Sequence, residues 1–173
     1  MTRWLTEDEQ RAWRGLLQMA ARLDARLNRS LQEQCGLSLA DYEVLVALSE
    51  STSGRLRMFE VADAVHWEQS RLSHHLARMS RRGLVAREEC HSDRRGAYLV
   101  LSEAGRAAID RAAPAHLDSV RSLVFDALDP ADVEVLVQVT STVLARLTST
   151  DGSHRQTPSP SGGTPPPPSE GQR

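Results

Sequence analysis

The feature that most constrains this chain is a basic amphipathic segment followed at once by a hairpin pattern, over residues 69–101. Three apolar residues recur at the i, i+4 and i+7 spacing of one helical face: Leu72, Leu76 and Met79. Gly83 follows the last apolar turn, where a helix commonly ends in a left-handed residue. Two short segments with strand character, 84–87 and 98–101, then flank a polar tip of turn residues. The pattern predicts a helix that ends before Gly83 and a β-hairpin behind it.

The predicted helix carries positive charge and no negative charge, because residues 69–87 contain five arginines and no acid. An α-helix fits the major groove of DNA, and an arginine at a hairpin tip can enter the minor groove beside it. The formal net charge of the chain is −2, and acids outnumber arginines over residues 102–134. One surface only is therefore expected to meet a polyanion. The alternative is a solvated helix face beside an ordinary hairpin.

The segments around this stretch predict a winged helix-turn-helix. An apolar stripe predicts a short helix just before a turn at residues 66–68: Met58, Val61, Ala62 and Val65. Two short helices joined by a turn, the second one basic, are typical of a DNA-binding helix-turn-helix, and the hairpin supplies the wing. Upstream, capping signals at Thr6 and Ser38 predict two helices, and residues 55–57 are short enough for a minor strand.

Downstream of the hairpin the chain predicts two more helices. Ser102 opens the first, in which Pro114 should cause a kink or a break. Asp129 and Pro130 fit the N-cap and N1 positions of the second. The apolar stripes of these helices and of the first helix have no obvious place in a winged core. We therefore expect both chain ends to pack together and against a twofold-related copy.

The expected fold class is mainly α with a small β-hairpin wing (α+β), built as a winged helix-turn-helix lobe plus a helical dimerisation region from both chain ends. The expected divisions are an N-terminal dimerisation helix, a DNA-binding lobe, C-terminal dimerisation helices and a disordered tail of Ser, Pro and Gly, at residues 1–37, 38–102, 103–147 and 148–173.

Composition excludes several function classes. Cys35 and Cys90 are too few for a disulfide framework, so a reducing, cytoplasmic location is expected. We find no apolar run that could span a membrane and no signal-peptide core. No cofactor or metal site is expected, since the Cys90–Asp93 spacing fits no zinc pattern. An enzyme is not expected either, because no nucleophile–base set and no phosphate-binding glycine loop is present.

Two stretches carry a family resemblance: L-S-H-H-L-A-R-M-S-R-R-G-L-V, residues 72–85, and S-D-R-R-G-A-Y-L-V-L-S-E-A-G-R, residues 92–106. They resemble the MarR family of transcriptional regulators, and the resemblance in element order covers roughly residues 10 to 147. The second is similar to the family's wing signature at Asp93, Arg95, Leu101, Ser102 and Gly105. The resemblance implies a homodimer that binds a pseudo-palindromic DNA operator, usually as a repressor, and that is released by a small molecule.

The resemblance also implies site residues. Five residues of the basic helix would approach the major groove or its phosphates: Ser70, Arg71, Ser73, His74 and Arg78. Arg95, with Arg94 beside it, would serve the minor groove, and Asp93 would brace the wing. Small-molecule sensing in the family occurs between the DNA-binding lobe and the dimer helices, and Trp13 and Trp67 are candidates for core or pocket walls.

Two alternatives stay open at this point. One is a thiol-based redox regulator that uses Cys35 or Cys90, although such sensing needs a lowered thiol pKa and a buried, inert thiol is the simpler interpretation of Cys35. The other is a protein-interaction module on the same fold that does not bind DNA. The basic segment argues against the latter.

Overall fold

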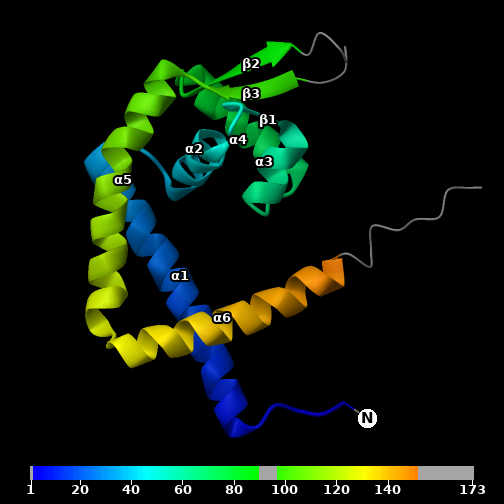
Figure 1. Cartoon of the computed structure of the whole chain (residues 1–173), viewed down its shortest axis with the longest axis vertical. Helices are drawn as coiled ribbons and strands as arrows, with labels where there is room; N and C mark the ends of the chain where they lie inside the picture. The colour runs from blue at the N-terminus through cyan, green and yellow to red at the C-terminus, as the bar shows by residue number, and fades with distance from the viewer. Residues whose placement is uncertain (1, 90–96, 152–173) are drawn as a thin grey trace, which may run out of the picture. The chain divides into compact units, whose positions relative to one another are not determined.

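The computed structural model of the chain describes residues 2–89 and 97–151, and the chain divides into two compact units, Met1–Ala127 and Leu128–Arg173. The first unit holds, in chain order, α1 (Glu7–Cys35), α2 (Leu39–Glu50), β1 (Arg55–Arg57), α3 (Met58–Ala64), α4 (Gln69–Arg81), β2 (Val85–Glu89), β3 (Ala97–Leu101), α5 (Glu103–Leu123) and the 3-10 turn η1 (Phe125–Ala127) (Figure 1). The second holds α6 (Pro130–Asp151). The helix-rich winged architecture predicted from the sequence is confirmed.

Local capping chemistry sets where the helices begin. In α1 the Thr6 hydroxyl accepts from the backbone N–H of Glu9, while the Glu9 carboxylate accepts from the backbone N–H of Thr6. Ser38 and Asp41 form the same reciprocal box at the start of α2. Each box satisfies two backbone donors that a helix would otherwise leave open. α1 ends at Gly36, whose φ of 66° is left-handed.

The helix-turn-helix consists of α3 and α4. Its turn closes through a hydrogen bond of 2.9 Å from the Trp67 backbone N–H to the Ala62 carbonyl. α4 ends where Gly83 adopts a φ of 73°, and the chain turns into β2. The predicted end of the basic helix is confirmed.

The wing is a three-stranded antiparallel sheet in the order β1-β3-β2. The hairpin strands pair from Val85 opposite Leu101 to Glu89 opposite Ala97. β1 pairs with the other edge of β3, as the minor strand predicted at residues 55–57. Residues 90–96 lie outside the described residues, and with them the predicted sites at Cys90, Asp93, Arg94 and Arg95.

One hydrophobic core joins most elements of the first unit. Leu31 of α1, Leu99 of β3 and Ala112 of α5 are fully buried in it. The fully buried residues of α2 are Val44, Leu45 and Leu48, and those of α4 are Leu72, Leu76 and Met79. The expectation that α1 and α5 have no place in the winged core is therefore wrong in part. The C-terminal part of α1 and the N-terminal half of α5 complete the core, because a lobe of three short helices and a small sheet leaves an apolar face that longer helices must cover.

α5 runs without a break through Pro114, so of the two predicted outcomes the break is wrong. Its ribbon bends but is not interrupted (Figure 1). Proline removes the hydrogen bond to the carbonyl four residues earlier, that of Asp110. Asp110 is exposed, so water can satisfy that carbonyl, and the buried residues before the proline keep the helix in place.

Many apolar side chains stay exposed in the single chain. In α1 these are Trp13, Leu16, Leu17 and Met19, and in α6 they are Val135, Val137, Val139, Val143, Leu144 and Leu147. Nothing in the described part of its own unit covers the apolar side of α6, and the exposed Val135, Val139 and Val143 widen that apolar surface. Among the described residues, no helix combines the length and apolarity needed to cross a membrane.

Gly105 lets α5 touch the base of the wing. Ser102 Oγ caps α5 by accepting from the Gly105 backbone N–H at 2.9 Å, and it donates to the Gly83 carbonyl at 2.6 Å. A methyl group at Gly105 would overlap the Leu84 carbonyl oxygen and crowd the Leu101 side chain. The contact between α5 and the start of β2 therefore requires glycine.

We expect Gly105→Ala to destabilise the protein by about 2–3 kcal/mol, because backbone atoms must move to admit the methyl group. Urea unfolding followed by circular dichroism measures the change. Gly15→Ala is the matched control, since the space around Gly15 is open and it lies inside helix α1. This control should leave stability unchanged or raise it by about 0.5–1 kcal/mol. Equal stability of wild type and Gly105→Ala would contradict the close contact.

Candidate nucleic-acid interface

α4 separates apolar from polar side chains as its sequence predicts. Leu72, Leu76 and Met79 are buried. Of the residues predicted to contact DNA, Ser73 is half-buried and the others are exposed: Ser70, Arg71, His74 and Arg78. The helix therefore presents hydroxyl, imidazole and guanidinium groups to solvent, all of which can bind phosphates or base edges.

Trp67 stands beside the start of α4 and orders the side chain of Arg71. The Arg71 guanidinium carbon lies 4.3 Å from the centre of the Trp67 ring, a cation–π distance. The ring of His75 stands nearly perpendicular to the Trp67 ring, at an interplanar angle of 85° and with centroids 5.2 Å apart. Trp67 is half-buried and packs on the core, so the structure places it as a support for α4.

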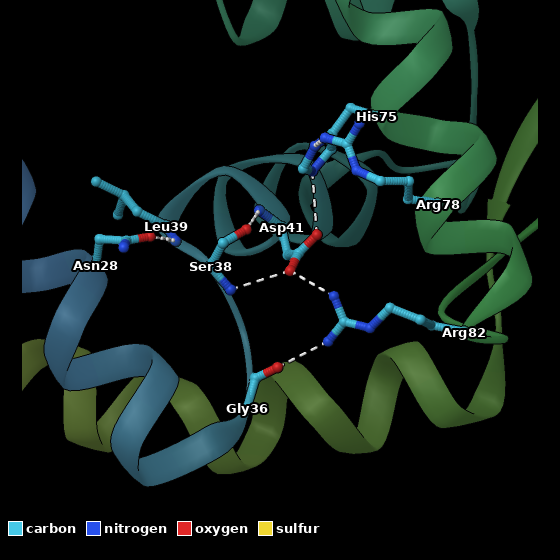
Figure 2. A network of polar contacts seen from close by, with 8 residues as sticks. All are labelled: Asn28, Gly36, Ser38, Leu39, Asp41, His75, Arg78 and Arg82. Carbon is cyan, nitrogen blue, oxygen red and sulfur yellow. Dashed lines mark hydrogen bonds and ion pairs between the residues drawn. The ribbon is translucent and has the colours of Figure 1, made fainter.

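Asp41 is the centre of a buried polar network under α4 (Figure 2). Its side chain is almost fully buried, at 5% exposure. One carboxylate oxygen, Oδ2, accepts from the Ser38 backbone N–H at 2.9 Å and from Arg82 at 2.7 Å. The other, Oδ1, lies 3.0 Å from Nε2 of His75. Arg82 also donates to the Gly36 carbonyl at 2.7 Å, so the network joins the end of α1, the start of α2 and the end of α4.

The pKa of Asp41 lies well below its ordinary value of 3.8. Burial alone would raise that pKa, but the contacts from His75, the Ser38 backbone and Arg82 favour the charged form more strongly. The carboxylate is therefore ionised at neutral pH. A buried charge of this kind is tolerated only where its partners are in place.

The network continues from His75 to the surface. A terminal guanidinium nitrogen of Arg78 lies 2.8 Å from Nδ1 of His75 (Figure 2). The Arg78 side chain is therefore exposed on α4, as predicted for a DNA contact, and is also hydrogen-bonded to the buried ring of His75.

Sequence reasoning found the exposed residues of this site but not its support. Ser38 and Asp41 carry a local capping signal, three residues apart. The pairing of Asp41 with Arg82, 41 residues later, has no such signal. Arg82 counted toward the basic charge of the segment, yet it belongs to the network under the helix.

A pocket of about 480 Å³ opens between α1, α2, the end of α3 and α5. Its apolar lining includes Leu27, Leu39, Val46, Ala47 and Val65. Tyr42 and His116 also line it, with ring centroids 4.5 Å apart. Neither Trp13 nor Trp67 lines this pocket, and the half-exposed Trp13 is not a core residue of the single chain.

Three carboxylates line the same pocket: Asp24, Glu43 and Glu50. Burial, and then the negative charge of Asp24, raises the pKa of Glu43, while the positive charge of Arg71 acts in the opposite direction. Burial lowers the pKa of His116. A carboxylate of the pocket therefore interacts electrostatically with an exposed arginine of α4.

The remaining candidate sites are the Cys35 thiol and a site for a metal ion. Cys35 is half-buried against the core, and its thiol donates to the Arg111 carbonyl across 3.9 Å. Within residues 2–89 and 97–151, no group of three or more His, Cys, Asp or Glu side chains could hold a metal ion.

The chain is similar to solved structures of DNA-binding regulators. AbsC, a MarR family transcriptional regulator from Streptomyces coelicolor, is 43% identical over 86% of this chain and 99% of its own, with a TM-score of 0.79. Sco3205, a MarR family transcriptional regulator from the same organism solved in complex with DNA, is 41% identical over 83% and 90%, also with a TM-score of 0.79. No protein-family model and no curated protein sequence matches the chain.

A solved structure with lower sequence identity shares the fold alone. BpsR of Bordetella bronchiseptica is 23% identical over 77% of this chain and 98% of its own, with a TM-score of 0.68.

The depressed pKa of Asp41 predicts a specific pH dependence. Because the folded pKa lies below the unfolded value of about 3.9, the stability that Asp41 contributes is full above pH 4 or so and is lost as the pH falls below it. Asp41→Asn should cost about 2–3 kcal/mol at pH 7, and the difference from wild type should shrink at about pH 3. Urea unfolding at both pH values measures it. Asp110→Asn, at an exposed acid of α5, should change stability little at either pH.

Proposed function

The chain belongs to the MarR family of transcriptional regulators, and from that premise we propose that it is a homodimeric repressor that binds a pseudo-palindromic DNA operator. The observation that carries the proposal is the exposed side of α4, which offers hydroxyl, imidazole and guanidinium groups in a segment without any acid. No catalytic step is part of this proposal.

In the proposed complex α4 enters the major groove. Arg71, held against Trp67, and His74 are placed to contact base edges or phosphates near the start of the helix. The wing then approaches the adjoining minor groove through Arg94 and Arg95, with Asp93 as the bracing residue. These three wing residues lie outside the described residues, so their roles rest on the wing motif alone.

Exposed apolar surface supports the homodimer. Leu16 of α1 and Leu144 of α6 are 50% and 59% exposed in the single chain, and similar residues surround each of them. Soluble monomers rarely leave contiguous apolar surface of this kind in water. A twofold-related copy would cover it and would also fix the distance between two α4 helices at about one turn of DNA.

A small-molecule effector fits the pocket between α1, α2 and α5. Its volume of about 480 Å³ and its apolar lining suit a compact organic molecule. In BpsR, which shares the fold, 6-hydroxynicotinic acid regulates DNA binding. In this chain Asp24, Glu43 and Glu50 line the pocket, so we expect an effector without negative charge. It would release DNA only if it binds better to the form of the dimer that does not match the operator.

The structure supports a thiol-based redox regulator less well than a regulator with a small-molecule effector. The half-buried Cys35 thiol is directed at a backbone carbonyl, which is typical of an inert structural thiol. A DNA-independent interaction module would not need the exposed arginines of α4.

The DNA-binding proposal is tested by selecting bound sequences from a random DNA pool and titrating the selected operator. Arg71→Ala and Arg95→Ala should each weaken binding about tenfold and lower the slope of log affinity against log salt by about one. Arg29→Ala, at an exposed position of α1, is the matched control and should bind as wild type. Failure of the wild type to enrich any sequence would remove the proposal.

The homodimer is tested by sedimentation. Leu144→Asp places an unpaired charge in the proposed apolar seam and should give monomer or aggregate with loss of operator binding. Gln138→Asp is the matched control, because Gln138 is exposed and shares the polar side of α6 with Glu134 and Ser141. It should remain dimeric. A wild type that sediments as a monomer at micromolar concentration, with full operator affinity, would refute the interface.

A further inference from the structure

We propose that His75 is a positioning residue for DNA binding, which holds the guanidinium of Arg78 ready at the surface of α4 while its other nitrogen faces Asp41. The proposal rests on the proposed function, because ordering Arg78 matters only if α4 binds DNA.

The hydrogen-bonding chemistry of the three side chains allows one arrangement. An arginine guanidinium can only donate, so Nδ1 of His75, 2.8 Å from Arg78, must accept. The ring then carries its proton on Nε2, which lies 3.0 Å from Asp41 Oδ1. Although this second contact is not aligned as a hydrogen bond, the carboxylate favours the proton on the nitrogen that faces it. Asp41 thereby selects the tautomer that can accept from Arg78 (Figure 2).

The location of His75 makes it a firm anchor. It is 6% exposed, it stands nearly perpendicular to the Trp67 ring, and it lies on the side of α4 that faces Asp41 of α2. Arg78 follows three residues later, one helical turn along, and is exposed. A buried ring that cannot rotate freely thus restrains a long side chain at the surface.

This restraint has a consequence for binding. A free arginine loses rotamer freedom when it docks on a phosphate, and an arginine already held in place loses less. A guanidinium has five N–H donors, so the bond to His75 leaves donors available for DNA. His75 therefore acts on DNA through Arg78 and needs no contact with DNA itself.

Two substitutions separate this role from simple core packing. The amide oxygen of His75→Asn can occupy the place of Nδ1 and accept from Arg78, but it loses the group that faces Asp41. The amide of His75→Gln can reach towards Asp41 as Nε2 does, but it loses the acceptor for Arg78. Both variants remove the ring, so each serves as the packing control for the other.

The experiment measures operator affinity by anisotropy and stability by urea unfolding, for wild type, His75→Gln, His75→Asn, Arg78→Ala and the double variant His75→Gln with Arg78→Ala. We expect His75→Gln to weaken binding about three- to tenfold relative to His75→Asn, the range of one net hydrogen bond. In the Arg78→Ala background, His75→Gln should weaken binding no further, because the residue through which it acts is gone.

The proposal is overturned if His75→Gln weakens binding equally with and without Arg78, since the effect would then be structural. It is also overturned if His75→Gln and His75→Asn bind alike while Arg78→Ala weakens binding. If Arg78→Ala has no effect while Arg71→Ala does, the positioning role fails and the DNA-binding proposal stands. Only a wild type that selects no DNA removes both.

Discussion

The buried carboxylate of Asp41 is the interaction on which the geometry of this lobe depends. Its three partners are Ser38 at the start of α2, His75 on α4 and Arg82 just after α4, and Arg82 also donates to the Gly36 carbonyl at the end of α1. An ionised group inside a protein is costly unless these partners are present together. The carboxylate therefore accepts few orientations of α4 relative to α1 and α2, whereas apolar packing alone would tolerate many.

The same arrangement explains how one short helix can be both buried and functional. Burial of Leu72, Leu76 and Met79 attaches α4 to the core, but apolar contacts do not fix the orientation of the helix. His75 and Arg82 provide the direction, because hydrogen bonds and ion pairs are specific in geometry. The outer side chains are then free to meet a polyanion from a platform whose orientation is already set.

Features that depend on residues close together in the sequence could be predicted, and features that depend on distant residues could not. The caps at Thr6 and Ser38 lie within a few residues of the groups they satisfy, and the helix starts predicted there are confirmed. The role of Arg82 depends on Asp41, far away in the chain, so its local pattern shows only a positive charge. The apolar stripe of α1 runs from Leu16 to Leu31 with one period, yet Leu31 is buried in the lobe and Leu16 is exposed. α5 packs against the C-terminal part of α1, where the Ser30 and Ser119 hydroxyls are hydrogen-bonded, and the local pattern of α1 carries no signal for this long-range contact.

The close approach of Gly105 to Leu84 has a mechanical consequence. Atoms already at contact distance cannot be pushed closer together, and Ser102 ties the two segments through hydrogen bonds to the Gly83 and Leu84 carbonyls, so we expect α5 and the first residues of the wing to move together. α5 has 21 residues and is therefore roughly 30 Å long. A tilt of about 5° over a lever of that length displaces one end by roughly 2–3 Å, comparable to the length of a hydrogen bond. His116 of α5 lines the pocket, so a small adjustment of α5 at that point would be carried to the first residues of the wing as a displacement of this size.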